Sequence, residues 1–164
     1  MAVELSTSNE RDALTSFLDK QRDTLIRKAR GVSDADARRA PTVSSLSLLG
    51  LLKHSAVWEA RWFQCILAGH ALPDGWPEQR SPIPDQDFVV DDGDTVELLV
   101  ARYEAAAQVS REIVDGMELD RACARTDIID ANLRYVLLHM IEETARHAGH
   151  ADIIRETLDG SRGT

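Results

Sequence analysis

The sequence predicts an all-α protein, specifically an antiparallel four-helix bundle with a long connection between its second and third helices. Apolar residues recur at helical spacing in four segments, and no segment shows the alternation of a convincing strand. Four of the five prolines lie between the second and third of these segments. The chain of 164 residues has the size of one domain and no internal repeat, so we expect residues 1–164 to form a single domain.

Caps and apolar stripes define the first two helices. Thr7 and Glu10 have the spacing of a capping box at the start of the first helix, and Gly31 is its expected stop. The second helix is expected over residues 47–68, closed by Gly69. Its stripe has the spacing of a helix face that packs on other helices and comprises Leu48, Leu51, Leu52, Trp58, Trp62 and Ile66.

The connection HALPDGWPEQRSPIPDQDFVVDDG follows, over residues 70–93. Its prolines argue against both a helix and a central strand. A connection of this length inside one domain often covers a functional site, but it can equally be a plain crossover between distant helix ends. Both interpretations are open at this point.

Two further helices complete the expected fold. The third is expected to begin at Asp94, with Glu97 in its first turn. The fourth is expected over residues 131–158, with Gly160 just beyond its end. Its apolar stripe consists of Leu133, Val136, Leu137, Met140, Ala151, Ile154 and Leu158.

Composition excludes several classes of function. A formal net charge of -9 at pH 7 argues against nucleic-acid binding, which needs a basic surface to neutralise phosphates. The N-terminal residues lack the pattern of a secretory signal, and no apolar stretch is long enough for a membrane span, so we expect a cytoplasmic protein without a membrane partner. Cys65 and Cys123 form no C-x-x-C motif, and each is expected to be a small buried apolar residue.

Ionisable side chains lie on the apolar side of the fourth helix. His147 falls inside the stripe and Glu143 at its margin, one turn earlier, so both can point at one object. An imidazole and a carboxylate at this spacing suit zinc, and His54 of the second helix would supply a third ligand. Three protein ligands leave a position open for water or substrate. An ordinary contact between Glu143 and His147, with His54 at the rim of its helix, is the alternative.

Glu59 is the candidate catalytic residue. It faces the core and would either accept a hydrogen bond or a proton near the metal, or pair with an arginine such as Arg61 or Arg146. Trp58 and Trp62 are expected to pack in the core, although one of them would also suit a pocket wall.

Two more histidines lie on the same side of the fourth helix. His150 would either orient a ligand or lie in solvent at the rim. His139, one turn before Glu143, is a further donor within reach.

LLGLLKHSAVWEARWF in the second helix and HMIEETARHAGHADIIRE in the fourth together resemble the DinB-like superfamily, and the likeness covers nearly the whole chain. The resemblance is to its actinobacterial branch, related to mycothiol-dependent enzymes. Members are four-helix bundles whose divalent metal, usually zinc or nickel, is held by a histidine of the second helix and two residues one turn apart in the fourth. His54 and His147 match histidine ligands, His147 opening the HAGH segment. Glu143 stands where most members have histidine, which resembles mycothiol-dependent maleylpyruvate isomerase.

The resemblance implies a divalent metal, zinc or alternatively nickel, held by His54, Glu143 and His147, with mycothiol or a similar low-molecular-weight thiol as cosubstrate. It implies transfer of that thiol to a small electrophile, or an isomerase that adds and then eliminates the thiol at the same site. A hydrolase with Glu59 as general base, and a metal-stabilised binding or dimerisation module, are the alternatives. Leu138 and Ile153, apolar and off the main stripe, favour a homodimer.

Overall fold

A computed structural model describes residues 5–73, 76 and 86–162. Within these ranges the all-helical class is confirmed, and the described residues form no strand beyond a single bridge between Ala122 and Asn132. The helices are α1 (Glu10–Ala29), α2 (Asp34–Ala37), α3 (Leu48–Ala60), α4 (Val96–Val114) and α5 (Leu133–Asp159). A π-helical segment, η1 (Arg61–Leu67), continues α3, and a 3-10 turn, η2 (Gln86–Phe88), precedes α4.

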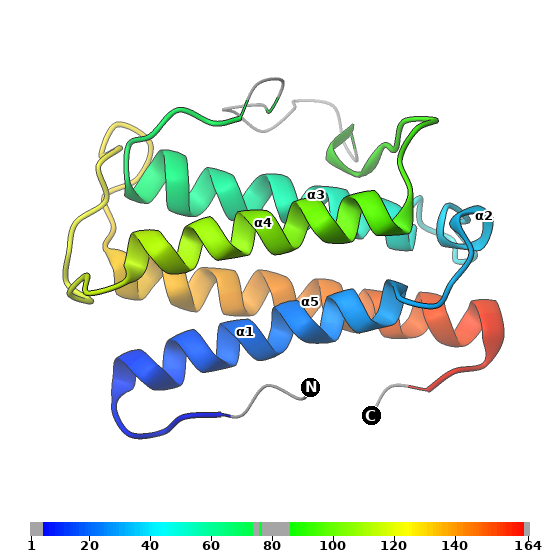
Figure 1. The fold of residues 1–164 in the computed structure, drawn as a ribbon, viewed down its shortest axis with the longest axis horizontal. Coiled ribbons are helices and arrows are strands. Elements are labelled where there is room, and N and C mark those ends of the chain that lie inside the picture. Colours follow the sequence, from blue (N-terminus) through cyan, green and yellow to red (C-terminus); the bar gives the residue numbers. More distant parts are fainter. Residues whose placement is uncertain (1–4, 74–75, 77–85, 163–164) are drawn as a thin grey trace.

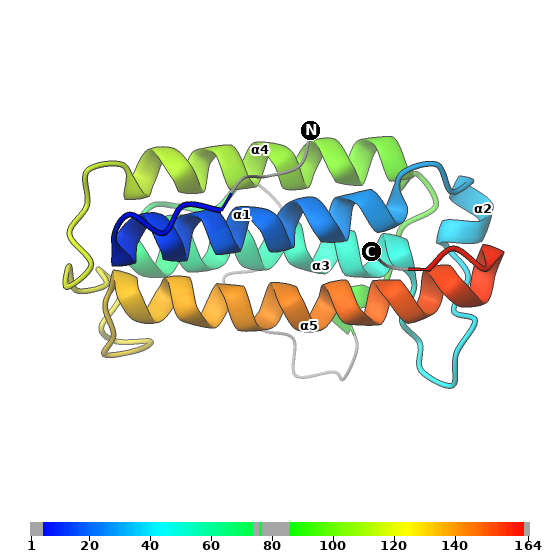
Figure 2. The same ribbon diagram turned by 90° about the horizontal axis from the view of Figure 1, so that it is seen from below.

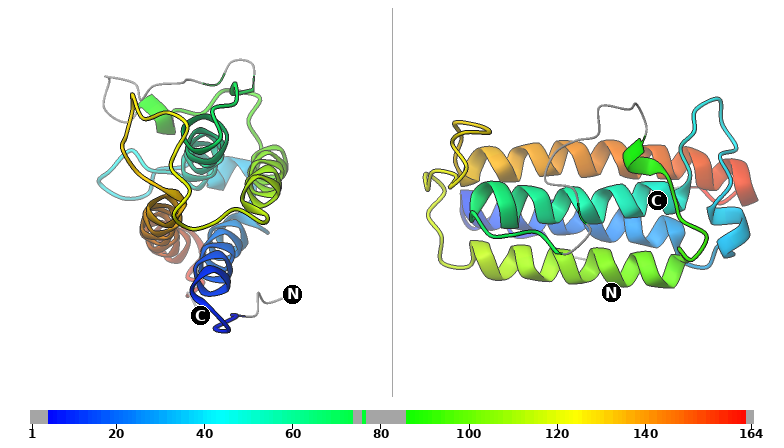
Figure 3. Two further views of the ribbon diagram at one scale, coloured as in Figure 1. Left: turned by 90° about the vertical axis from the view of Figure 1, so that its left-hand side faces the viewer. Right: turned by 90° about the horizontal axis from the view of Figure 1, so that it is seen from above.

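The four long helices α1, α3, α4 and α5 lie side by side, and the short α2 lies at one end of them (Figures 1 and 2). Seen end-on, they surround a common interior (Figure 3). Helix α1 packs chiefly on α5, and α3 on α4. None of the described helices is both long and apolar enough to cross a membrane.

The helix directions differ from the antiparallel arrangement that we predicted. α3 and α4 run in the same direction, as do α1 and α5 (Figure 1). Ion pairs agree with this: Lys53 near the start of α3 lies 3.2 Å from Asp94 just before α4, and Arg134 in the first turn of α5 lies 2.7 Å from Glu10 in the first turn of α1. The connection after η1 therefore returns the chain to the end at which α3 begins.

Each long helix begins at a polar residue whose side chain accepts a hydrogen bond from the backbone N–H three residues later. Ser47 caps α3 in this way, at the residue where this helix was expected to begin. The caps of α1 and α4 are Asn9 and Thr95, so the expected starts at Thr7 and Asp94 are wrong by two residues and by one. α5 begins after Asn132 and ends at Gly160, whose positive φ of 77° suits glycine.

The core fills the space between the four long helices. Leu25, Leu52 and Tyr103 lie in one buried cluster and Leu18, Phe63 and Leu137 in another. Cys65 and Cys123 are buried free thiols, as expected.

The connection over residues 70–93 is described only in part, since residues 74–75 and 77–85 lie outside the described ranges. Its last part packs on α3. Lys53 pairs with Asp91 at 2.8 Å, and the Phe88 carbonyl approaches the helix so closely that a Cβ on Gly50 would lie 2.6 Å from it. Glycine at position 50 therefore lets the backbone of η2 pack directly on α3, which places Phe88 beside His54.

Candidate functional site

A cavity of about 410 Å³ lies between α3 and α5. The three predicted metal ligands all line it. The fold therefore brings His54 next to Glu143 and His147, which lie at least 89 positions later in the sequence. The complete lining consists of His54, Ser55, Trp58, Trp62, Phe88, His139, Met140, Glu143, Thr144, Arg146 and His147.

Two rows of side chains at four-residue spacing form the long walls of the cavity. His54, Trp58 and Trp62 project from α3 and η1, and His139, Glu143 and His147 project from α5. The two helices run in opposite directions, so each end of one row meets the opposite end of the other (Figure 1). The ring of His54 lies 4.8 Å from that of His147, and the ring of Trp62 lies 4.3 Å from that of His139.

His147 is buried and uncharged. Its exposed fraction is 7%, and within the described parts of the chain neither of its ring nitrogens has a hydrogen-bond partner. Burial lowers the pKa of His147 to about 4, and the nearby Glu143 carboxylate offsets only part of that effect. At neutral pH the imidazole therefore keeps a free lone pair, the form that binds a metal ion.

Glu143 lies between two partners. One of its oxygens, Oε2, is 3.8 Å from Nε2 of His147, while Oε1 is ion-paired with Arg146. Arg146 also pairs with Glu142 at 2.6 Å, so it would keep a carboxylate partner if Glu143 turned away. The other oxygen, Oε2, is already on the His147 side, at a distance from Nε2 that two ligands of one metal ion need to shorten only slightly.

His54 completes the set from α3. Its ring stacks on Phe88 with 4.2 Å between centroids and 11° between planes, and meets His147 edge-on. These contacts orient His54 toward the α5 histidine. The ligand types suit zinc, which takes imidazole nitrogen and carboxylate oxygen. In the described ranges, however, no group of three or more His, Cys, Asp or Glu residues already has the spacing of a metal shell.

The structure places the other two histidines differently. His139 lines the cavity beside Trp62, two turns along α5 from His147. His150 does not line the cavity; it is half-buried, and its ring lies 6.0 Å from that of His147.

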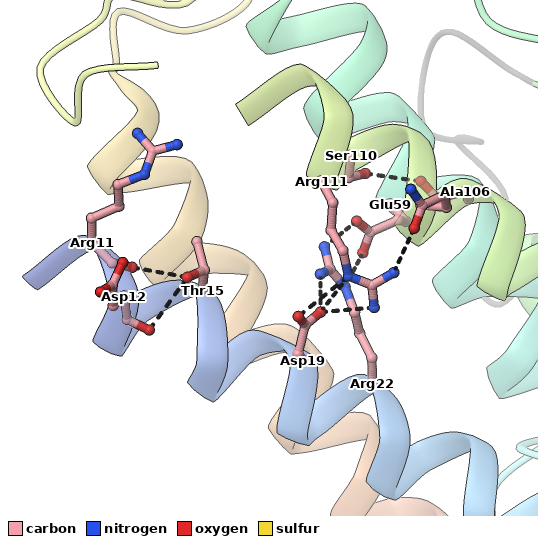
Figure 4. A network of polar contacts seen from close by, with 10 residues as sticks. Arg11, Asp12, Thr15, Asp19, Arg22, Glu59, Ala106, Ser110 and Arg111 are labelled. Carbon is pink, nitrogen blue, oxygen red and sulfur yellow. Dashed lines mark hydrogen bonds and ion pairs between the residues drawn. The ribbon is translucent and has the colours of Figure 1, made fainter. Parts of the chain in front are cut away.

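Glu59 lies outside the cavity lining. It is fully buried and ion-paired with Arg22 of α1, which is itself 4% exposed. The buried-partner interpretation fits this geometry, but the arginine is neither of those we named. Arg22 also lies 2.7 Å from Asp19, which Arg111 of α4 contacts in turn (Figure 4). Burial by itself lowers the pKa of Arg22, but Glu59, together with Tyr103 and Asp19, raises the pKa on balance, so the guanidinium stays charged.

Comparison with known families decides the relationship. The model of a family described as mycothiol S-transferase matches residues 13–160, which is most of the chain. The chain belongs to the mycothiol S-transferase family. This family is part of the DinB-like superfamily, so the resemblance found in the sequence is confirmed.

Among solved structures, a conserved protein of locus from Enterococcus faecalis is similar to this mycothiol S-transferase family member, with a TM-score of 0.71. The two are 15% identical, and the match covers 94% of this chain and 100% of that chain. At this identity the likeness concerns the fold alone. No curated protein matches the chain.

Sequence reasoning missed several wall residues of this family member's cavity. Ser55 and Thr144 are buried polar residues that line it, and no described residue hydrogen-bonds to the Ser55 hydroxyl. Their signal was available, because each follows a predicted ligand, His54 or Glu143, at a position where an apolar residue would be expected. Phe88 carried no such signal, since its place depends on the path of the long connection.

Proposed function

We propose that the protein is a metal-dependent S-transferase that joins mycothiol, or a similar low-molecular-weight thiol, to a small electrophile. Membership of the mycothiol S-transferase family supports the transferase activity and the thiol. The observation that carries the metal dependence is His147, a buried neutral imidazole with no hydrogen-bond partner in the described structure, facing His54 and next to Glu143.

His54, Glu143 and His147 would hold the metal, zinc in preference to nickel, because two imidazoles and a carboxylate match the ligands of catalytic zinc sites. Bound there, the metal would supply a positive charge that makes a thiol ionise at neutral pH. Arg146 pairs with Oε1 of Glu143 and with Glu142, which leaves Oε2 of Glu143 on the His147 side for the metal.

The chemistry is a nucleophilic substitution or addition at carbon. The thiol loses its proton to water, and a sulfur lone pair forms the new C–S bond. In a substitution the leaving group departs with its bonding electrons, and in an addition the displaced pair moves to the neighbouring atom and takes up a proton. The isomerase alternative uses the same addition, then rotation about the carbon–carbon bond that has become single, and then elimination of the thiol.

The hydrolase alternative needs a general base at the cavity. Glu59 was our candidate, but its carboxylate is engaged by Arg22 outside the lining, which gives this alternative no support. We further propose that α1, α3, α4 and α5 form a DinB-like four-helix bundle, which membership of a family in the DinB-like superfamily supports. A cytoplasmic location and a homodimer through the exposed Leu138 and Ile153 stay predictions.

Metal content measured by mass spectrometry tests the proposal. We expect about one zinc or nickel ion per chain in the untagged protein, and loss of the metal in His54→Ala and Glu143→Ala. His150→Ala is the matched control, because His150 is on the same helix but outside the lining, and it should keep the metal. A wild-type protein that cannot be loaded with metal, or variants that retain it, would contradict the site.

The transfer itself is tested with mycothiol and iodoacetamide, by following the S-alkylated product by mass spectrometry. Product formation faster than the uncatalysed reaction, and lost in Glu143→Ala, is the expected result. Equal rates with wild type and variant would argue against transfer at this site.

A further inference from the structure

We propose that the end of the cavity formed by Trp62, His139 and Met140 is a binding subsite for a flat, apolar, aromatic part of the electrophile. This inference rests on the proposed function for what lies at the other end, where His54 and His147 meet. It adds a substrate class, because it distinguishes aromatic from aliphatic electrophiles.

Two rings in contact with each other, those of Trp62 and His139, line this end of the cavity. The Trp62 ring lies 4.3 Å from that of His139 and is tilted by 50° to it, so the two rings enclose an angle and do not stack. Tyr135 lies parallel to His139, with 6.0 Å between centroids and 3° between planes, and its ring is also 6.3 Å from that of Trp62, so the three rings form one cluster. Trp62 is 8% exposed. A flat group entering the cavity meets preoriented ring faces and edges.

The chemistry of the lining favours an aromatic occupant over the sugar of a thiol cosubstrate. Trp62, His139 and Met140 offer ring faces and a thioether, which interact favourably with aromatic rings. A sugar needs several hydrogen-bonding groups around it. The charged groups of the lining, Glu143 and Arg146, lie one turn or more further along α5, toward His147.

The spacing suits a small reactive molecule. His54 and Trp62 are eight residues apart along one wall, or about 12 Å at the rise of a helix. Trp58 lies between them, with its ring centroid 5.7 Å from that of His54. An electrophile with one or two fused rings at Trp62 would therefore direct a short reactive arm toward the His54 end, where the thiol would be held.

Binding of unreactive probes tests the subsite independently of thiol and of turnover, and can be measured with and without metal. We would compare 2-naphthol with decahydro-2-naphthol, its saturated and non-planar counterpart, by isothermal titration calorimetry on chelator-treated and metal-loaded protein. We expect 2-naphthol to bind about tenfold more tightly than decahydro-2-naphthol, which corresponds to the free energy of one or two aromatic contacts. Trp62→Leu should abolish this preference.

Trp76→Leu is the matched control. Trp76 packs against the core cluster that contains Leu25 and Leu52, and it does not line the cavity. Its replacement should therefore leave the preference for 2-naphthol intact. If circular dichroism shows that Trp62→Leu is unfolded, His139→Leu replaces it, since His139 forms the opposite wall and is only half-buried.

The outcomes separate the two proposals. Equal binding of both probes, no binding of either, an unchanged preference in the folded Trp62→Leu or His139→Leu variant, or displacement of 2-naphthol by glucosamine overturns the aromatic subsite, even if the protein transfers thiols. A ring-dependent preference that Trp62→Leu removes supports the subsite, even if the protein proves to bind no metal and the proposed function fails.

Discussion

At the scale of single residues, the site depends on a histidine that stays uncharged. His147 has a pKa of about 4 in the folded chain against an ordinary value of 6.5, because burial disfavours its charged form. The unfolded state therefore binds a proton more readily, so protonation favours unfolding. Above about pH 7 this penalty is absent, and it grows as the pH falls from 6.5 toward 4.

The first prediction follows from the lowered pKa of His147, which makes protonation favour unfolding. In metal-free protein the free energy of unfolding should fall between pH 6.5 and pH 4 by up to about 3 kcal/mol through His147 alone. Urea denaturation of the wild type and of His147→Gln at several pH values isolates this contribution, because all other titrating groups are common to both. Identical pH slopes for the two proteins would show that His147 is not held neutral.

Glu59 gives a second prediction at this scale. Removing its carboxylate leaves the buried Arg22 charge without its main partner, so Glu59→Ala should destabilise the fold by about 3–5 kcal/mol. Glu104→Ala breaks an exposed ion pair with Arg30 and should change stability little.

Metal content distinguishes this structural role of Glu59 from a direct one. Because Glu59 is outside the cavity lining, Glu59→Gln should retain the metal when the protein remains folded. Loss of metal from folded Glu59→Gln would place the carboxylate in the metal site after all.

At the scale of elements, the close approach of η2 to α3 gives a third prediction. Alanine normally stabilises a helix relative to glycine by about 1 kcal/mol. At position 50 that gain should be lost, because the new Cβ would meet the Phe88 carbonyl at 2.6 Å and displace the turn that packs Phe88 on His54. We expect Gly50→Ala to lower the melting temperature.

Gly149→Ala is the control for this substitution. Gly149 lies inside α5 with nothing within 4 Å of an added Cβ, so alanine there should raise the melting temperature. A rise of equal size for Gly50→Ala would mean that η2 does not rest on α3 as described.

Element positions could be predicted where local patterns determine them. The start of α3 near Ser47 and the Gly160 stop were correct, because a helix start depends on a local hydrogen bond and a stop on a local φ. α2 was missed because four residues, Asp34–Ala37, are too few to show a stripe. The shared direction of α3 and α4 could not be read from periodicity, which is the same in either direction along a helix.

In the candidate site, too, local patterns predicted some features, and tertiary contacts determine the others. Helical spacing predicted that Glu143 and His147 share a face, and the structure adds His54 to the same cavity. The partner of Glu59 could not be identified, because Arg22 is 37 residues away and reaches it only through the packing of α1 on α3. Pocket walls such as Phe88 depend on tertiary contacts that no local pattern contains.

At the scale of the whole molecule, a metal held by α3 and α5 should contribute to stability, since it binds the folded chain and links two helices. A free metal concentration 100 times the dissociation constant corresponds to about 2.7 kcal/mol. We therefore predict that adding a chelator lowers the melting temperature of the wild type. The His54→Ala protein should melt at the same temperature with and without chelator, and a wild type insensitive to chelator would contradict a metal that bridges these helices.

The most direct test of the central claim is X-ray absorption at the zinc edge of the zinc-loaded protein, before and after addition of mycothiol. Without thiol, we predict a shell of nitrogen and oxygen at about 2.0–2.2 Å, and with thiol one sulfur at about 2.3 Å. A variant without Cys65 and Cys123 should show the same sulfur signal with mycothiol and none without it. That result would exclude the two cysteines as the source of the sulfur. A shell that mycothiol leaves unchanged would contradict thiol transfer at this site.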